Sequence, residues 1–389
     1  MSNLSMLTAG AVLAGSLAAA MPADASRYSV VYSFKGGADG ATVFSGLVNV
    51  GGTLYGTTWA GGADNFGTVY AVTPAGSETV VYSFKGGSDG VSPYAGLLNV
   101  GGTLYGTTER GGANDLGTVF AVTPAGREKV LYSFQGGLDG TLPVGGLIKS
   151  GAALYGTTSG GGDGSACGTP GCGTVFKVTT AGVESVLFRF GNYTPDAVSP
   201  LGNLIASDGE LYGTAYNSDD ANYPLGAVFE TTKRGTESVL HLFGSGTDGA
   251  DPVGGLINVN GTFYGTTESG GANEYGTVFS LTPDGTETVL YSFKGGKDDG
   301  AGPQAGLIDV GGTLYGTTGN GGRKNFYSFG TVFKITLGGQ ETVMHKFGPL
   351  AGPDGSVPLS NLIKVGGRLY GTTYAGGTDA YGTVFEIRP

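Results

Sequence analysis

Two glutamates occupy matching places in a repeated stretch of the chain. Glu109 and Glu268 each follow directly after the tripeptide Gly-Thr-Thr, one in the second copy of the repeat and one in the fifth. Two carboxyl groups roughly 5 to 10 Å apart can act as general acid and general base in glycoside hydrolysis. With three of the seven copies between them around a ring, we expect the carboxyl groups to lie too far apart, and we predict no catalytic residue.

Other aromatic and polar residues stand in the same variable segments. An aromatic ring beside a carboxylate, amide or guanidinium group can stack on a sugar and hydrogen-bond to its hydroxyls. Trp59, the single tryptophan of the chain, is the strongest candidate for such a contact. The predicted ligand-binding residues are Trp59, Glu109, Arg110, Glu268, Arg323 and Tyr374. The alternative interpretation is that each belongs to an ordinary solvated loop.

Metal-binding chemistry has few candidate residues. The two histidines, His241 and His345, stand where other copies of the repeat have tyrosine, so we expect them to be structural. One aspartate recurs in every copy, usually before glycine, which is typical of a turn whose side chain caps local backbone N–H groups. A ring of Ca²⁺ ligands is the alternative for these residues, which are Asp39, Asp89, Asp139, Asp196, Asp248, Asp299 and Asp354. We predict no metal and no cofactor.

A repeat that occurs seven times positions these candidates. Its first half is Leu/Phe-Tyr-Gly-Thr-Thr/Ala, its second half is Gly-Thr/Ala-Val-Phe/Tyr, and successive copies lie 50 to 57 residues apart. A period in this range indicates a propeller or an array of repeats. Each copy contains four short apolar segments, which in the second copy are 96–100, 103–108, 117–123 and 128–134.

The turns between these segments indicate antiparallel strands. Gly101-Gly102 suits a two-residue hairpin, and the stretch from Pro124 to Gly126 suits the next turn. Four short antiparallel strands per copy are typical of a blade in a β-propeller. The sequence therefore predicts an all-β fold, a seven-bladed β-propeller of four-stranded blades.

The two ends of the chain favour a closed ring over an open solenoid. Residues 28–34 read as the fourth strand of a blade, whereas 382–387 read as a third strand with no fourth strand after it. Pairing these two segments would remove an open sheet edge. We therefore predict that residues 27–34 complete the blade made by residues 355–389.

The beginning of the chain resembles an export signal. An apolar run over 6–20 precedes Ala23-Asp24-Ala25, which reads as a cleavage site before Ser26. We predict a signal peptide over 1–25, a single propeller domain over 26–389, and a secreted, periplasmic or cell-surface location, with a retained anchor as the alternative. In an exported protein, Cys167 and Cys172 favour a disulfide over a zinc site.

Charge narrows the choice of partners. The net charge is −11, which makes nucleic acid or an anionic membrane an unfavourable partner. We therefore expect no nucleic-acid partner and, after removal of the signal peptide, no membrane contact. A glycan or another protein is left as the partner.

The repeat resembles the Gloeo/Verruco (GloVer) tandem repeat of exported bacterial proteins. The resemblance rests on Leu-Tyr-Gly-Thr-Thr, the Gly-Gly after it, Gly-Thr-Val-Phe and Tyr-Ser-Phe, and covers nearly everything after Ser26. It implies no particular activity. More distantly, Gly-Thr-Val-Phe-Ala-Val-Thr-Pro resembles blades of quinoprotein-like and kelch propellers. The quinone enzymes of that group usually carry a Trp in most blades, so a chain with Trp59 alone implies no quinone cofactor.

The main functional prediction is an exported, non-catalytic binding or interaction module. Its glycan or protein ligand would bind on the face formed by the long loops before each first strand and between each second and third strand. One alternative is a polysaccharide-active hydrolase or lyase that uses loop carboxylates. Another is a purely structural cell-surface protein. We expect a protein that is not an enzyme.

Overall fold

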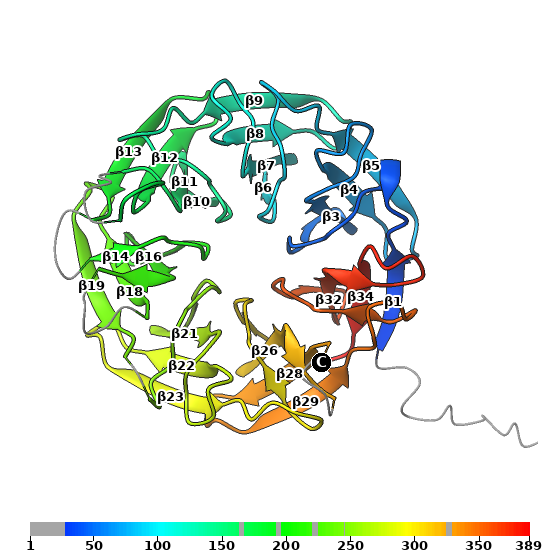
Figure 1. Ribbon diagram of the computed structural model, residues 1–389, viewed down its shortest axis with the longest axis vertical. Coiled ribbons are helices and arrows are strands. Elements are labelled where there is room, and N and C mark those ends of the chain that lie inside the picture. The colour runs from blue at the N-terminus through cyan, green and yellow to red at the C-terminus, as the bar shows by residue number, and fades with distance from the viewer. Residues whose placement is uncertain (1–27, 163–166, 192–195, 220–224, 245, 324–328) are drawn as a thin grey trace, which may run out of the picture.

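Seven four-stranded antiparallel sheets surround a central axis in the computed structural model (Figure 1). The structure describes residues 28–162, 167–191, 196–219, 225–244, 246–323 and 329–389. Each sheet is one blade, with its first strand nearest the axis and its fourth strand at the rim. The prediction of a seven-bladed β-propeller is confirmed.

The strands of each blade follow one another in the chain, except in the last blade. Blade 1 has β2 (Val48–Val50), β3 (Thr53–Thr58), β4 (Thr68–Val72) and β5 (Glu78–Ser83); blade 2 has β6 (Leu98–Val100), β7 (Thr103–Thr108), β8 (Thr118–Val122) and β9 (Glu128–Ser133); blade 3 has β10 (Ile148–Ser150), β11 (Ala153–Thr158), β12 (Thr174–Thr179) and β13 (Glu184–Arg189); blade 4 has β15 (Ile205–Ser207), β16 (Glu210–Ala215), β18 (Ala227–Thr231) and β19 (Glu237–Leu242). Blade 5 has β20 (Ile257–Val259), β21 (Thr262–Thr267), β22 (Thr277–Leu281) and β23 (Glu287–Ser292); blade 6 has β25 (Ile308–Asp309), β26 (Thr313–Thr318), β28 (Thr331–Thr336) and β29 (Glu341–Lys346); blade 7 has β31 (Ile363–Val365), β32 (Arg368–Thr373), β34 (Thr383–Ile387) and β1 (Tyr28–Ser33). Three two-stranded ribbons lie in the loops of blades 4, 6 and 7: β14 (Ala197–Val198) with β17 (Asn217–Ser218), β24 (Gly300–Ala301) with β27 (Asn320–Gly321), and β30 (Gly355–Ser356) with β33 (Ala375–Gly376).

The first described strand closes the ring. β1 pairs antiparallel with β34, with Tyr28 opposite Ile387 and Ser33 opposite Thr383. In Figure 1 the blue start of the chain accordingly lies beside its red end. The predicted closure by the N-terminal strand is confirmed, and the third strand of blade 7 is not left as a sheet edge.

A glycine in the second strand lets an aromatic ring of the third strand lie close to it. Gly106 of β7 pairs with Phe120 of β8. A Cβ atom on Gly106 would stand 2.6 Å from Cζ of Phe120, closer than real Cβ contacts allow. The glycine in Leu-Tyr-Gly-Thr-Thr is therefore a packing requirement of the blade.

Aromatic contacts join neighbouring blades in the core. Phe84, at the end of blade 1, meets Phe120 of blade 2 edge-on, with ring centroids 5.1 Å apart, and a similar pair occurs at the other junctions. The tyrosines of the second strands, such as Tyr105, are buried among these clusters, as expected from the sequence. Each hydrophobic cluster therefore spans two blades.

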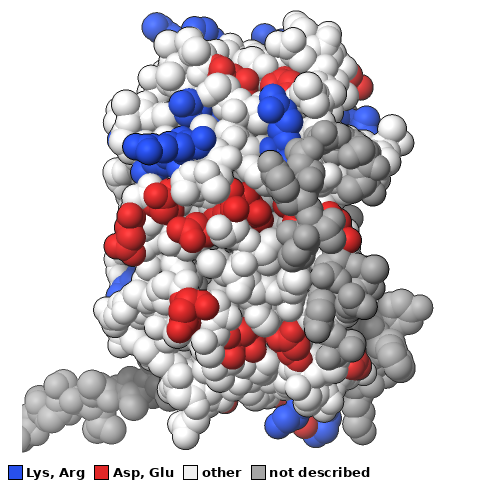
Figure 2. Space-filling model, turned by 90° about the vertical axis from the view of Figure 1, so that its left-hand side faces the viewer, with Lys and Arg blue, Asp and Glu red and all other residues white. Residues whose placement is uncertain are grey.

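Charged residues are unevenly spread on the outside of the ring. On the side formed by β13 and β19, acidic side chains occupy a band across the middle of the surface, and most of the basic ones lie above it (Figure 2). The one helical element of the described residues is a 3-10 turn, η1 (Gly37–Asp39). No helix in the described ranges has the length and apolar character needed to span a bilayer.

Two predictions concern the loops and the beginning of the chain. Cys167 and Cys172 form a disulfide, as predicted, with their Cα atoms 5.3 Å apart. The predicted signal peptide over 1–25 lies outside the described residues. The signal peptide and the location outside the cytoplasm therefore remain predictions.

Candidate functional site at the mouth of the central channel

Two rings of residues surround one end of the central channel. The inner ring is formed by one residue of the loop before each first strand: Phe44, Tyr94, Val144, Leu201, Val253, Gln304 and Leu359. The outer ring is formed by the residue directly after each second strand: Trp59, Glu109, Ser159, Tyr216, Glu268, Gly319 and Tyr374. Four of the six predicted ligand-binding residues thus belong to the outer ring.

Backbone hydrogen bonds fix the two rings to each other. The N–H of Trp59 donates to the carbonyl of Thr42 at 2.9 Å, and that of Glu268 donates to the carbonyl of Asp251 at 3.0 Å. The equivalent bond recurs in every blade. Each outer-ring residue is thereby held against the loop that carries an inner-ring residue.

The backbone of the inner loops is strained at one repeated position. Thr42 and Val357 have φ values of 64° and 56°, in the left-handed region that disfavours side chains branched at Cβ. Such a conformation costs on the order of 1–3 kcal/mol and is concentrated at functional sites. The position lies two residues before the inner ring, which lines the channel.

The channel contains a cavity of about 450 Å³. Its lining combines the inner ring with polar groups farther down, including Ser45, Asn203, Asn258 and Asn361. This volume is within the range of pockets that hold small molecules, and such pockets place a few polar groups in a mainly apolar wall.

Aromatic rings from blades 7, 1 and 2 gather on one side of the mouth. Phe44 stacks on Tyr94 with ring centroids 4.6 Å apart, and lies 5.0 Å from Tyr374 and 6.3 Å from Trp59. Trp59 and Tyr374 are 38% and 37% exposed, which is unusual for rings of this size. They offer a partly exposed apolar platform at the rim of the cavity.

The carboxyl groups of Glu109 and Glu268 are each held by one donor. The indole N–H of Trp59 donates to Oε2 of Glu109 at 3.2 Å, and the amide of Gln304 donates to Oε1 of Glu268 at 2.6 Å. Burial and the charges of Glu109 and Glu268 all raise the pKa of the Tyr94 hydroxyl. The Tyr94 hydroxyl is therefore within electrostatic reach of both carboxylates, although they come from blades 2 and 5.

A third carboxyl group lies on the side of Glu268. Burial raises the pKa of Asp251, against the effect of a hydrogen bond with Ser269. Asp251 in turn raises the pKa of Tyr216, with smaller contributions from burial and from Glu268. Asp251 and Glu268, joined by the backbone bond from the Glu268 N–H to the Asp251 carbonyl, thus both influence the Tyr216 hydroxyl.

The two arginines predicted to bind ligand, Arg110 and Arg323, do not belong to either ring. Arg110 is exposed beside Glu109, and its carbonyl accepts a hydrogen bond from the Thr108 hydroxyl at 2.8 Å. Nε of Arg323 donates to the carbonyl of Phe347, next to the outermost strand of blade 6, at 3.2 Å. That bond turns Arg323 toward the rim, away from the channel.

The repeated aspartates cap turns, as the sequence favours. Oδ2 of Asp39 accepts the backbone N–H of Lys35 at 2.7 Å, and its other oxygen accepts the hydroxyl of Tyr32 at 2.7 Å. The two histidines replace this tyrosine, each with Nε2 3.2 Å from the aspartate: His241 at Asp248 and His345 at Asp354. These contacts agree with a structural role for both histidines.

Sequence reasoning missed several residues at the mouth, namely Phe44, Tyr94, Tyr216, Asp251 and Gln304. A signal for three of them was present. Phe44, Tyr94 and Gln304 fill a variable position between nearly constant neighbours, usually Pro before it and Ala or Gly followed by Gly-Leu after it. A position that varies between copies while its flanking residues stay nearly the same is typical of a side chain that lines a binding site.

The protein is thus a closed β-propeller in which aromatic rings and carboxyl groups surround one end of the central channel. The family model of the Gloeobacter/Verrucomicrobia repeat matches residues 7–224 and 199–389. The chain belongs to this repeat family, as its motifs indicated. No curated protein matches the sequence.

Solved structures with a similar fold include several proteins named as enzymes. A puromycin-hydrolysing peptidase of Mycobacterium tuberculosis matches 93% of this chain with 12% identity and a TM-score of 0.52, and this chain spans 54% of it. A gluconolactonase of Xanthomonas campestris matches 74% of this chain and 82% of its own length, with 16% identity and a TM-score of 0.43. A luciferin-regenerating enzyme matches 74% of this chain and 88% of its own length, with 14% identity and a TM-score of 0.42.

These matches correct the main functional prediction. A non-catalytic binding module was expected, but the structure that matches 93% of this chain is named as a peptidase, so that expectation is withdrawn. At this level of identity the matches establish the fold alone, and the reaction has to be argued from the residues at the channel mouth.

Proposed function

We propose that this protein is a hydrolase of glycosidic bonds, with Glu109 and Glu268 as its acid–base pair. The observation that carries the proposal is that two hydrogen-bonded carboxyl groups, Glu109 with the Trp59 indole and Glu268 with the cavity-lining Gln304, stand beside a cavity with an aromatic rim. Glycoside hydrolysis needs two carboxyl groups on either side of one bond and a surface on which sugar rings can stack.

The hydrogen bonds suggest how the two roles are divided. The Gln304 amide, at 2.6 Å, is the closer of the two donors, so it favours negative charge on Glu268 more than the Trp59 indole does on Glu109, which suits the group that attacks the anomeric carbon or activates water. Glu109 would then protonate the leaving oxygen. Its bond with the Trp59 indole at 3.2 Å holds the carboxyl group at the mouth and leaves its second oxygen for the substrate.

The shape of the rim favours a substrate larger than one sugar. Trp59 and Tyr374 stand outside the cavity and are partly exposed, so they can stack on sugar units beyond the one that enters it. We therefore propose an oligosaccharide or polysaccharide substrate. The predicted signal peptide would bring the enzyme to such a substrate outside the cytoplasm.

A cleavage assay with the full chain tests the proposal. Neutral and acidic oligosaccharides are incubated with the wild type, with the double variant E109Q/E268Q, and with E274Q, and new reducing ends are measured. Glu274 is an exposed glutamate in the loop that follows Glu268, so E274Q makes the same chemical change outside the two rings. We expect cleavage by the wild type and E274Q only.

Two results would overturn the proposal. One is a wild type that releases no reducing ends from any oligosaccharide. The other is a double variant that cleaves as fast as the wild type. A product with an ultraviolet-absorbing double bond would show elimination instead of hydrolysis, and would assign the site to a lyase.

A further inference from the structure

A pair of carboxyl groups recurs where neighbouring blades meet. At the junction of blades 4 and 5, Glu287 begins the outermost strand of blade 5, and carboxylate oxygens of Glu287 and of the turn-capping Asp248 lie within 4.8 Å of each other. Glu78 and Asp39 are the equivalent pair at the junction of blades 7 and 1. The hydroxyl of Tyr32, from the outermost strand of blade 7, donates to the same aspartate. Equivalent glutamates begin the outermost strands of blades 2 to 6: Glu128, Glu184, Glu237, Glu287 and Glu341.

Each of these glutamates has an oxygen that lacks a partner. Oε1 of Glu78 is buried and makes no hydrogen bond in the described part of the chain, and the same is true of Oε1 in the five equivalents. The aspartate beside it is already an acceptor, from tyrosine or histidine and from backbone N–H groups, at five of the six junctions. A second ionised carboxylate next to this aspartate would have a buried oxygen without a donor and a like charge beside it, which is unfavourable away from water.

We propose that the glutamate and the aspartate share one proton at each of these six junctions, and that the shared protons hold neighbouring blades together. A protonated glutamate can donate to the aspartate, which satisfies both groups at once. This bond would join the outermost strand of one blade to the loop that leads into that blade. The aspartate of this loop also accepts a hydrogen bond from the outermost strand of the preceding blade, as Asp39 does from Tyr32. The bond would therefore help to connect two blades.

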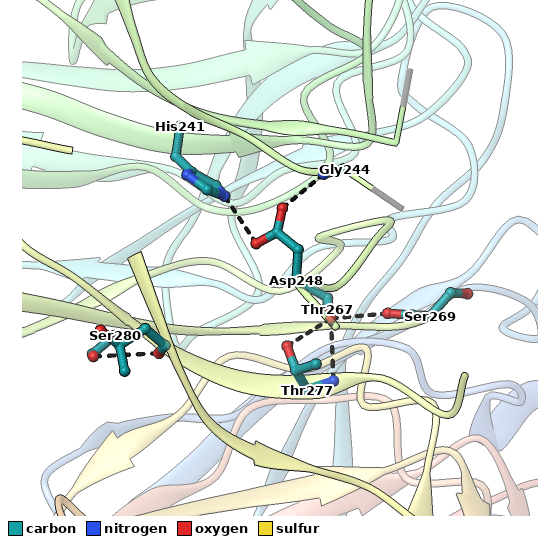
Figure 3. A network of polar contacts seen from close by, with 8 residues as sticks. His241, Gly244, Asp248, Thr267, Ser269, Thr277 and Ser280 are labelled. Atoms are coloured by element: carbon teal, nitrogen blue, oxygen red, sulfur yellow. Dashed lines mark hydrogen bonds and ion pairs between the residues drawn. The ribbon is translucent and has the colours of Figure 1, made fainter. Parts of the chain in front are cut away.

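A bound metal is the rival explanation at one junction. Ligand atoms of His241, Asp248 and Glu287 lie within 4.8 Å of one another. Figure 3 shows His241 and Gly244 both directed at the carboxylate of Asp248. The unpaired glutamate oxygen, however, also occurs at five junctions where tyrosine or phenylalanine replaces the histidine. A proton accounts for all six junctions, whereas a metal would account for one.

The junction of blades 6 and 7 supplies a natural contrast. Tyr28 takes the place of the glutamate there and stacks on His345, with ring centroids 3.6 Å apart. Burial opposes ionisation of Asp354, but hydrogen bonds with His345 and Tyr28 outweigh it and lower the pKa of this aspartate. Because Tyr28 replaces the glutamate, this junction needs no shared proton.

The pKa values of the glutamates agree with a proton held near neutral pH. Burial, followed by the neighbouring aspartate, raises the pKa to about 8 for Glu78 and Glu237 and to about 7 for the other four. Asp219 adds to the rise in the pKa of Glu237. The neighbouring groups that lower the pKa values of the other glutamates, and so oppose the effect of burial, are Lys35, Tyr32, Lys85, Tyr82, Tyr132, Arg189, His241 and Lys294.

The sign of the pH effect follows from these directions. The folded pKa lies above the unfolded value of 4.5, so the folded protein binds more protons than the unfolded chain between about pH 4.5 and pH 8. The melting temperature should therefore fall as pH rises through this window and level off above it. Stability that depends on the shared protons is fully present below pH 4.5.

Thermal unfolding of the full chain between pH 5 and pH 9 tests this proposal. Glutamine keeps a donor next to the aspartate at every pH, so the triple variant E78Q/E128Q/E287Q imitates three protonated junctions permanently. We expect its melting temperature to fall about half as much as that of the wild type between pH 5 and pH 8, since three of six junctions no longer titrate. E274Q, with its exposed glutamate, should follow the wild type.

Infrared spectroscopy gives a second readout on the wild type alone. Protonated buried carboxyl groups should give a C=O stretching band at pH 6 that disappears by pH 9. A melting temperature that is constant from pH 5 to pH 8, an equal fall in the triple variant, or no such band would each overturn the proposal. Stabilisation by added Zn²⁺ in the wild type and not in E287Q would assign the His241 junction to a metal.

Discussion

At the scale of single residues, buried hydroxyl groups connect one blade to the next. The hydroxyl of Thr57 in β3 donates to the carbonyl of Ala95 in the loop of blade 2, at 3.0 Å. The same bond recurs as Thr107 to Gly145, Thr214 to Gly254, Thr266 to Ala305, Thr317 to Ser360 and Thr372 to Ser45. In these six blades the first Thr after the motif's glycine is thus a contact between blades, made to the loop that carries the inner ring.

Replacing one of these threonines with valine should destabilise the ring. Thr266→Val keeps the shape of the side chain and leaves the buried carbonyl of Ala305 without its donor. The expected loss is about 1–3 kcal/mol in the free energy of unfolding, measured by urea denaturation. Thr266→Ser keeps the hydroxyl and should lose less, and equal losses in the two variants would show that the hydroxyl does not matter.

The partly exposed tryptophan allows a prediction about substrate binding that rests on the proposed function. Trp59→Phe keeps a ring at the rim and removes the indole N–H that holds Glu109. It should lower kcat more than it raises KM, because the acid loses its orientation while stacking persists. Trp59→Ala removes the ring and should raise KM as well. Steady-state kinetics on one oligosaccharide measures both, and identical kinetics in the two variants would contradict these roles.

At the scale of elements, ring closure depends on the strand β1. It pairs with β34 along its whole length, from Tyr28 to Ser33. A chain that begins at Lys35 would expose β34 as a sheet edge and uncover Phe385. We expect a large fall in melting temperature and self-association in solution. A synthetic peptide of residues 28–34 should restore the melting temperature, while a scrambled peptide should not.

The disulfide between Cys167 and Cys172 should contribute little to global stability. It closes a very short loop within blade 3, so the loss of chain entropy in the unfolded state is small. Cys167→Ser with Cys172→Ser should lower the free energy of unfolding by about 2 kcal/mol at most. A loss much larger than this in urea denaturation would mean that the bond supports more than its own loop.

The elements were more predictable from the sequence than the site. Strand order, turns and ring closure follow from patterns that recur seven times, so each copy supports the others, and the N-terminal strand is recognisable as the missing fourth strand. Glu109 and Glu268 were recognised as equivalent, but their relation to Tyr94 depends on how narrow the ring is at its axis. The width of the channel is set by how the glycines and aromatic rings of neighbouring blades pack together. The sequence of one repeat does not contain this information.

At the scale of the whole molecule, closure is what produces the site. No blade holds both glutamates: Glu109 comes from blade 2, Glu268 from blade 5, and the donor Gln304 from the loop that enters blade 6. The aromatic platform likewise combines blades 7, 1 and 2. Seven blades that close on one axis therefore create an acidic and aromatic mouth, and a partly open ring would separate its components.

The kinetics of single and double variants test this account most directly. We predict that E109Q and E268Q each lower kcat/KM for the cleaved oligosaccharide by about 10²–10⁴-fold, and that the double variant is little worse than the poorer single variant, because the two groups act as one unit. E274Q should keep wild-type kinetics. Single variants that keep wild-type kcat/KM, or effects that multiply as if the two residues were independent, would contradict the placement of one active site at the channel mouth.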